Sequence, residues 1–210
     1  MAKHSLYAGK CVILQAESSN VKSFKVKAQN IIMTAPEYIQ LKAYARQDGF
    51  YLALLWTASF VCYILGIANQ MLEMLALGLA IVTPFFVASR LRKFRDEGRE
   101  GLISFKRSYV YTVFVFFYGA VLLAVVQFIY FAYLDNGYLL SSFSKMLSSA
   151  EGKELISQYG MTQMMEESLE AMANTRPIDY ALNILTFNLM VGFVLGVPIG
   201  LVMQRSTVKS

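Results

Sequence analysis

The chain is poor in charged residues, histidine and cysteine. Only 16% of its 210 residues are charged, whereas soluble domains carry about a quarter, and 56% are hydrophobic. His4 is the single histidine, which excludes histidine-based metal centres and Ser-His-Asp triads. We therefore expect a membrane protein, and we predict no metal ion and no other cofactor.

The two cysteines offer no disulfide framework. Cys62 lies within a long apolar run, and Cys11 lies in a polar N-terminal tail that we place in the cytoplasm, where thiols stay reduced. The chain also lacks a paired-carboxylate, metal-ligand or phosphate-loop motif. The sequence therefore points to no particular reaction.

The sequence predicts an all-α membrane protein with four transmembrane helices. A helix needs about 20 apolar residues to cross a hydrocarbon core of about 30 Å. Runs of this kind occupy residues 50–68, 71–89, 108–134 and 181–203. Residues 135–180, between the third and fourth runs, contain helical patterns and an excess of acidic side chains. We expect a small helical extracytoplasmic segment there.

The placement of basic residues predicts the orientation. Lysine and arginine next to a span resist translocation, so basic loops stay in the cytoplasm. Of the 19 Lys and Arg residues, seven lie in residues 1–49, seven between the second and third spans, and two after the fourth, whereas the outer loops hold none and three. Both termini should therefore be cytoplasmic. Because this pattern accounts for the net charge of +5, we expect no nucleic-acid partner.

The chain is predicted to have three parts. They are a cytoplasmic N-terminal segment at residues 1–45, a four-helix membrane domain at residues 46–205 and a cytoplasmic tail at residues 206–210. Within the first part, Pro36 suits the first turn of a short helix at residues 37–47 that would lie on the inner membrane surface.

Met33 is an alternative translation start. Under this hypothesis residues 1–32 come from a misplaced start codon, and the first span follows soon after the true one. Detection of peptides from residues 11–27 in the native protein would contradict it.

Besides Asn188, which is considered with the fourth span below, Glu73, Gln127 and Asn183 are polar residues inside the predicted spans. A strongly polar group inside a membrane is a functional-site candidate by default. Glu73 lies near the outer end of the second span, so its carboxylate is expected to reach the headgroups. Gln127 is expected to hydrogen-bond a neighbouring helix, for instance an asparagine of the fourth span.

The fourth span carries a glycine face. Gly192, Gly196 and Gly200 are four residues apart, so they share one side of the helix, and Asn188 extends that side by one turn. The lack of side chains lets another helix approach closely. We predict helix packing through this face. The sequence leaves open whether the other helix belongs to the same chain or to a second copy.

The basic loop between the second and third spans has two interpretations. Ser104 is placed to cap the third helix, which would make the loop a structural connection and an orientation signal. Alternatively, the loop binds a phosphate or an anionic lipid headgroup where that helix begins. The candidate contacts are Arg90, Arg92, Lys93, Arg95, Ser104, Lys106 and Arg107.

Two stretches carry a resemblance to a known family. They are FRDEGREGLISFKRSY at residues 94–109 and QFIYFAYLDNGY at residues 127–138, followed by the acidic outer loop and the glycine-rich last span. In this order they resemble domain-of-unknown-function family 4199, a family of bacterial four-span membrane proteins, over residues 46–205. The resemblance implies an inner-membrane protein of Gram-negative bacteria and implies no catalytic activity.

Three functions are compatible with these features. We favour a non-enzymatic accessory or scaffolding protein that packs on a membrane enzyme or on itself. A transporter or lipid carrier working as an oligomer is the alternative, although the sequence shows neither an inverted repeat nor a buried charge pair. A membrane enzyme on lipid-linked substrates, with Glu73 or Asp135 as base, ranks third. The expected partners are the lipid bilayer, anionic lipid, and a second copy or a membrane enzyme.

Overall fold

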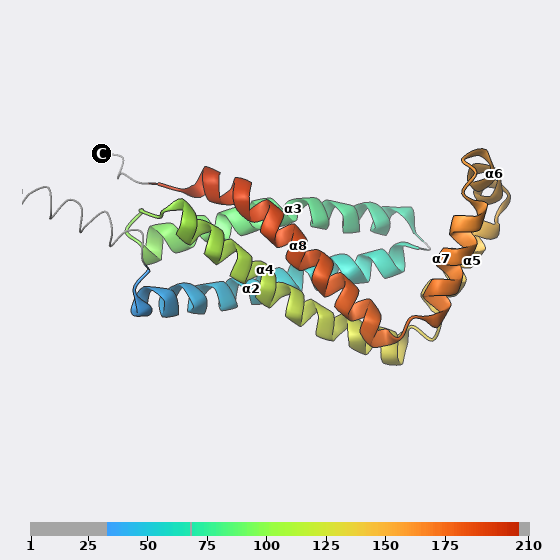
Figure 1. Ribbon diagram of the computed structural model, residues 1–210, viewed down its shortest axis with the longest axis horizontal. Coiled ribbons are helices and arrows are strands. Elements are labelled where there is room, and N and C mark those ends of the chain that lie inside the picture. Colours follow the sequence, from blue (N-terminus) through green and yellow to red (C-terminus); the bar gives the residue numbers. More distant parts are fainter. Residues whose placement is uncertain (1–32, 68, 206–210) are drawn as a thin grey trace, which may run out of the picture. The chain divides into compact units, whose positions relative to one another are not determined.

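The computed structural model describes residues 33–67 and 69–205, and Figure 1 shows their helices. Of the described residues, 33–41 belong to one unit, and those from Lys42 onward belong to a second. The hypothesis of an alternative start at Met33 and the predicted C-terminal tail concern residues outside the described ones.

The described residues are helical apart from short connections. The elements are α2 (Ala35–Gly66), α3 (Gln70–Gly98), α4 (Phe105–Ile129), the π-helix η1 (Tyr130–Leu134), α5 (Tyr138–Ser148), α6 (Ala150–Gln158), α7 (Thr162–Asn174) and α8 (Pro177–Met203). By length and composition α2, α3, α4 continued by η1, and α8 can each cross a membrane. The predicted all-α membrane fold is confirmed.

α2 begins well before the predicted first span. The backbone N–H of Thr34 donates to Glu37 Oε2 at 3.0 Å, which secures the first turn. From Ala35 the helix continues without a break to Gly66, so the separate surface helix predicted at residues 37–47 is wrong. Because no proline follows the first turn, the backbone hydrogen bonds extend directly into the apolar stretch.

A tight reversal joins α2 to α3. The Asn69 side chain accepts a hydrogen bond from the backbone N–H of Met71 at 3.0 Å and so caps α3. At the end of α2, a Cβ built on Gly66 would lie 2.7 Å from the backbone nitrogen of Glu73. Only glycine fits at this distance, so Gly66 permits the two helices to turn back on each other within a few residues.

The predicted turn at Asp135 is present after η1. The Asp135 carboxylate accepts hydrogen bonds from the backbone N–H groups of Gly137 and Leu139, both at 3.1 Å. Gly137 has a φ of +78°, a left-handed conformation that glycine adopts at little cost. The Asp135 side chain thereby ends the third membrane-crossing element and starts α5.

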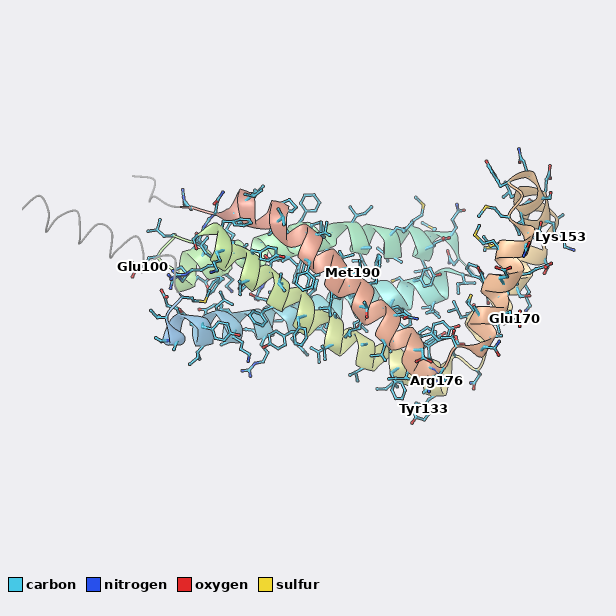
Figure 2. The ribbon with its side chains drawn as sticks, in the orientation of Figure 1. Glu100, Tyr133, Lys153, Glu170, Arg176 and Met190 are labelled. Carbon is cyan, nitrogen blue, oxygen red and sulfur yellow. The ribbon has the colours of Figure 1, made fainter. Side chains whose placement is uncertain are left out.

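The short helices α5, α6 and α7 lie at the end of the bundle opposite the basic loop. Figure 2 shows Lys153 and Glu170 at one end and Glu100, from the basic loop, at the other. In these three helices, all of which the structure describes, no residue is fully buried. The segment predicted to be extracytoplasmic is therefore helical but lightly packed.

α4 forms the centre of the bundle. Tyr111, Val115, Phe116 and Ala120 are completely buried. α2 crosses α4 at two glycines, one on each helix. A Cβ on Gly49 of α2 would lie 2.6 Å from Tyr118 Cβ. A Cβ on Gly119 of α4 would lie 3.2 Å from a methyl carbon of Leu52. The two backbones therefore approach closely, as small residues allow between membrane helices.

The glycine face of α8 packs against aromatic side chains of α4 in the same chain. A Cβ on Gly192 would lie 2.5 Å from Phe116 Cβ, and one on Gly196 would lie 3.0 Å from Cε2 of Tyr109. Further along, a Cβ on Gly200 would lie 3.1 Å from Cε2 of Phe105. The three glycines thus admit the bulk of α4, and this face is occupied within the chain.

Gly192→Ala and Gly78→Ala should change stability in opposite directions. The added methyl group at Gly192 overlaps Phe116, and such overpacking costs about 1–3 kcal/mol. At Gly78 nothing lies within 4 Å of an added Cβ, so the better helix propensity of alanine should keep or raise stability. Thermal unfolding of both proteins in one detergent measures the difference. Equal midpoints would contradict the packing of α8 on α4.

Candidate functional site

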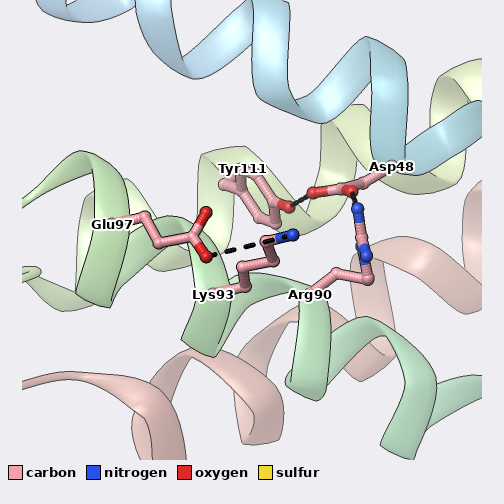
Figure 3. A network of polar contacts seen from close by, with 5 residues as sticks. All are labelled: Asp48, Arg90, Lys93, Glu97 and Tyr111. Atoms are coloured by element: carbon pink, nitrogen blue, oxygen red, sulfur yellow. Dashed lines mark hydrogen bonds and ion pairs between the residues drawn. The ribbon is translucent and has the colours of Figure 1, made fainter.

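A buried polar cluster joins α2, α3 and α4 (Figure 3). Asp48 of α2 is only 3% exposed. Arg90 of α3 donates from Nε to Asp48 Oδ1 at 2.5 Å and also forms an ion pair with it. Tyr111 of α4 donates its hydroxyl hydrogen to Asp48 Oδ2. Both carboxylate oxygens are therefore bonded, each to a different helix, which offsets the cost of burying the charge.

Aromatic rings surround this cluster. Phe94 stacks on Tyr111 with ring centroids 4.9 Å apart and an angle of 3° between the planes, and Tyr44 packs on Phe94 at 5.1 Å. The Arg90 guanidinium lies 4.9 Å from the centre of the Tyr51 ring, a cation–π distance. The rings limit water around the ion pair, which strengthens its attraction.

The cluster corrects the expectation that the chain has no buried charge pair. From the sequence, Arg90 is a candidate headgroup contact and Asp48 is not a candidate site residue. One signal was available, since Asp48 lies two residues before the first predicted span and Arg90 directly follows the second. In antiparallel neighbouring helices these positions fall at the same end. Arg90 is bound to Asp48 in the structure.

The basic loop is tied to the end of α8. Arg95 donates from Nη1 to the carbonyl oxygen of Met203 at 3.3 Å, which satisfies a C-terminal carbonyl of that helix. The backbones of Ile103 and Arg205 exchange two hydrogen bonds, at 3.0 and 2.8 Å. Gly101, with a φ of +80°, makes the turn that brings the loop into this position. The loop therefore holds together the end of α3, the start of α4 and the end of α8.

The remaining loop residues differ in exposure. Ser104 occupies the predicted N-cap position of α4, although its side chain makes no capping hydrogen bond. Its carbonyl oxygen accepts a hydrogen bond from the backbone N–H of Ser108 at 3.0 Å. Arg107 is buried. Three basic side chains stay exposed, namely Arg92, Lys93 and Lys106. Contacts of these three with anionic headgroups remain a prediction.

The polar residues of the spans lie in different surroundings. Gln127 is buried, and within the described part of the chain its Oε1 atom has no hydrogen-bond partner. It does not accept the predicted bond from an asparagine of α8. Asn183 is exposed, and Glu73 lies in the first turn of α3. Glu73 and Asn188 line the same cavity, whereas Gln127 and Asn183 are not among its lining residues.

Two cavities lie beside the end of α2 and the start of α3. One, of about 420 Å³, is lined by residues of α2, α3, α4 and α8, among them Asn188. The other, of about 640 Å³, lies between α2, α3 and α5. Glu73 and Tyr63 line both. Cavities of this size are in the range of small-molecule sites. Sequence reasoning flagged Glu73 but could not find the space beside it.

Among residues 33–67 and 69–205, no three His, Cys, Asp or Glu side chains come together in a way that could hold a metal ion. The polar cluster at Asp48 is a link between helices, and the cavities are lined largely by apolar side chains. The geometry therefore supports packing and binding of apolar groups.

The four long apolar helices make the chain an integral membrane protein. A family model with the description "Protein of unknown function (DUF4199)" matches residues 47–205. The chain therefore belongs to this family, and the resemblance seen in residues 94–109 and 127–138 is confirmed. No curated protein and no solved structure matches the chain.

Asp48→Ala should destabilise the protein by about 3 kcal/mol, because it leaves the Arg90 charge largely buried without its partner. Tyr111→Phe removes one hydrogen bond and should cost about 1 kcal/mol. The control is Lys93→Ala, which breaks the exposed pair with Glu97, 3.9 Å apart, and should cost less than about 1 kcal/mol.

Thermal unfolding in detergent measures all three variants. The double variant Asp48→Ala/Arg90→Ala should be more stable than Asp48→Ala alone, since it removes the unpaired charge. An Asp48→Ala protein as stable as the Lys93→Ala control would contradict the role of the cluster.

Proposed function

We propose that the protein is a non-enzymatic accessory or scaffolding subunit that binds a membrane partner through α3. α3 is the least covered of the four long helices: 17% of its apolar stretch is buried, against 39% for α4. On its outward side Met74, Ile81 and Phe85 are 68%, 67% and 70% exposed. Gly78 lies on the same side, at offsets of four and seven residues along the helix.

Gly78 carries the proposal. Exposed apolar side chains alone suit lipid as well as a partner, because lipid tails are equally apolar. A glycine within a span differs, since it weakens the helix unless a backbone must come close. The other glycines in the apolar stretches all lie where an added Cβ would come within 3.4 Å of another part of the chain, whereas nothing lies within 4 Å at Gly78. A helix of a partner protein would fill this gap between Met74 and Ile81.

The partner is a membrane-spanning helix of another protein, such as a membrane enzyme, or of a second copy. The glycines of α8 support the choice of α3, because they already pack on α4. We further propose a location in the inner membrane of a Gram-negative bacterium with both termini in the cytoplasm. The family resemblance supports the location, and the basic loop between α3 and α4 supports the orientation.

Gly78→Leu should abolish the association with the partner while the protein remains folded, because the leucine fills the gap. A tagged copy is purified from native membranes in mild detergent, and a photoreactive residue in place of Ile81 identifies what α3 touches. The expected result is one stoichiometric crosslinked partner, or a crosslinked dimer, that Gly78→Leu loses. Val125→Phe on the exposed side of α4 is the control and should retain it. A crosslink that persists in Gly78→Leu, or crosslinks to lipid alone, would refute the proposal.

The orientation has its own test. In a chain without Cys11 and Cys62, Glu170→Cys should react with a membrane-impermeant maleimide added to cells whose inner membrane is intact. Glu100→Cys should react only after that membrane is opened, because the basic loop resists translocation. The reverse labelling pattern would overturn the proposed topology.

A further inference from the structure

The two cavities beside Glu73 share two lining residues, Glu73 and Tyr63. The inner cavity, of about 420 Å³, extends from Glu73 along α3 to Pro84 and is also lined by Trp56 and Phe187. The outer cavity, of about 640 Å³, extends from Glu73 to Lys145 of α5. Because Glu73 and Tyr63 line both, the two cavities are neighbours. These cavities are distinct from the side of α3 that carries Gly78. Gly78 lines neither cavity, and nothing lies within 4 Å of a Cβ placed on it.

The inner cavity is suited to a hydrocarbon chain. It lies beside the predicted spans, at the depth of the acyl chains, and its lining is mostly apolar. Two polar groups in its wall are already bonded within the protein: Ser59 donates to the Ala76 carbonyl at 2.9 Å, and Trp56 Nε1 donates to Thr83 Oγ1 at 3.0 Å. Their hydrogen bonds are satisfied, so a chain of methylene groups can fill the space without stranding them.

The outer cavity presents charges of both signs. The Glu73 carboxylate and the Lys145 ammonium both line it, together with the rings of Tyr63, Tyr138 and Phe143. In the part of the chain that the structure describes, neither Glu73 nor Lys145 forms an ion pair, so both are available to a ligand. Aromatic rings beside a carboxylate favour a cation, and a lysine beside a hydroxyl-bearing wall favours a phosphate.

We propose that the two cavities together bind one zwitterionic phospholipid. Its ammonium group contacts Glu73 and the surrounding rings, its phosphate contacts Lys145, and one acyl chain occupies the inner cavity. An anionic lipid would match Lys145 but would place its charge near the Glu73 carboxylate without a compensating cation. The pairing of opposite charges therefore selects a zwitterionic headgroup over an anionic one.

Native mass spectrometry of the full chain in mild detergent tests this site. Phosphatidylethanolamine and phosphatidylglycerol with identical acyl chains are titrated separately. The expected result is one tightly bound phosphatidylethanolamine, preferred by about tenfold over phosphatidylglycerol. Glu73→Gln and Lys145→Gln should each weaken phosphatidylethanolamine binding by about tenfold, because each removes one charge-assisted contact. The controls are Glu170→Gln and Lys153→Gln. Both residues lie between α4 and α8, as Lys145 does, but they line neither cavity. These two variants should bind phosphatidylethanolamine as tightly as the unchanged protein.

A second arm tests the acyl chain. Ala80→Phe places a ring in the inner cavity and should abolish tight binding, whereas Val125→Phe on α4 should not. Independently of any variant, a phosphatidylethanolamine with a photoreactive group in its acyl chain should label peptides containing residues 76–84 or 184–195. Equal affinity for both lipids, a preference for phosphatidylglycerol, charge variants no weaker than their controls, or labelling elsewhere would each overturn the proposal.

Discussion

Close backbone contact at glycine positions is the constraint on which this membrane domain depends. Lipid tails are as apolar as the side chains of the helices, so burial of apolar surface does little to drive one span onto another, and dense packing must hold them. Gly192, Gly196 and Gly200 let α8 lie against the aromatic side of α4, and Gly49 and Gly119 allow α2 to cross the same helix closely. α4 is central because both neighbours reach it through residues without side chains.

The two ends of the domain are stabilised differently. At the end that carries the basic loop, Asp48 links three helices, and the bonds of Arg95 and Ile103 tie the loop to the end of α8. At the opposite end the short helices α5–α7, all of which the structure describes, contain no fully buried residue. One cavity lies among the long helices and a second lies beside α5, and Glu73 lines both. The end with the basic loop is therefore held by hydrogen bonds between helices, whereas the opposite end is lightly packed.

Local patterns predicted most of the fold. Apolar length located the spans, Asp135 and Gly137 marked the turn after the third, and a spacing of four residues placed the glycines of α8 on one face. The first helix was the exception, because its polar first half resembled a surface helix although nothing in it interrupts the backbone hydrogen bonds. The site was harder to predict. Asp48, Arg90 and Tyr111 lie far apart in the sequence, and no local pattern connects them.

The sequence by itself determined the number of membrane-crossing helices, the face on which the α8 glycines lie and the place where basic charge accumulates. These properties follow from the length, helical periodicity and composition of each segment, all of which can be read from residues that are close together in the sequence. Only the tertiary structure decided that the α8 glycines meet α4 rather than a second copy, that Arg90 is bound to Asp48, and that Glu73 borders open space. Those outcomes depend on which helices become neighbours, and that choice rests on shape complementarity between distant segments, which a linear pattern does not contain.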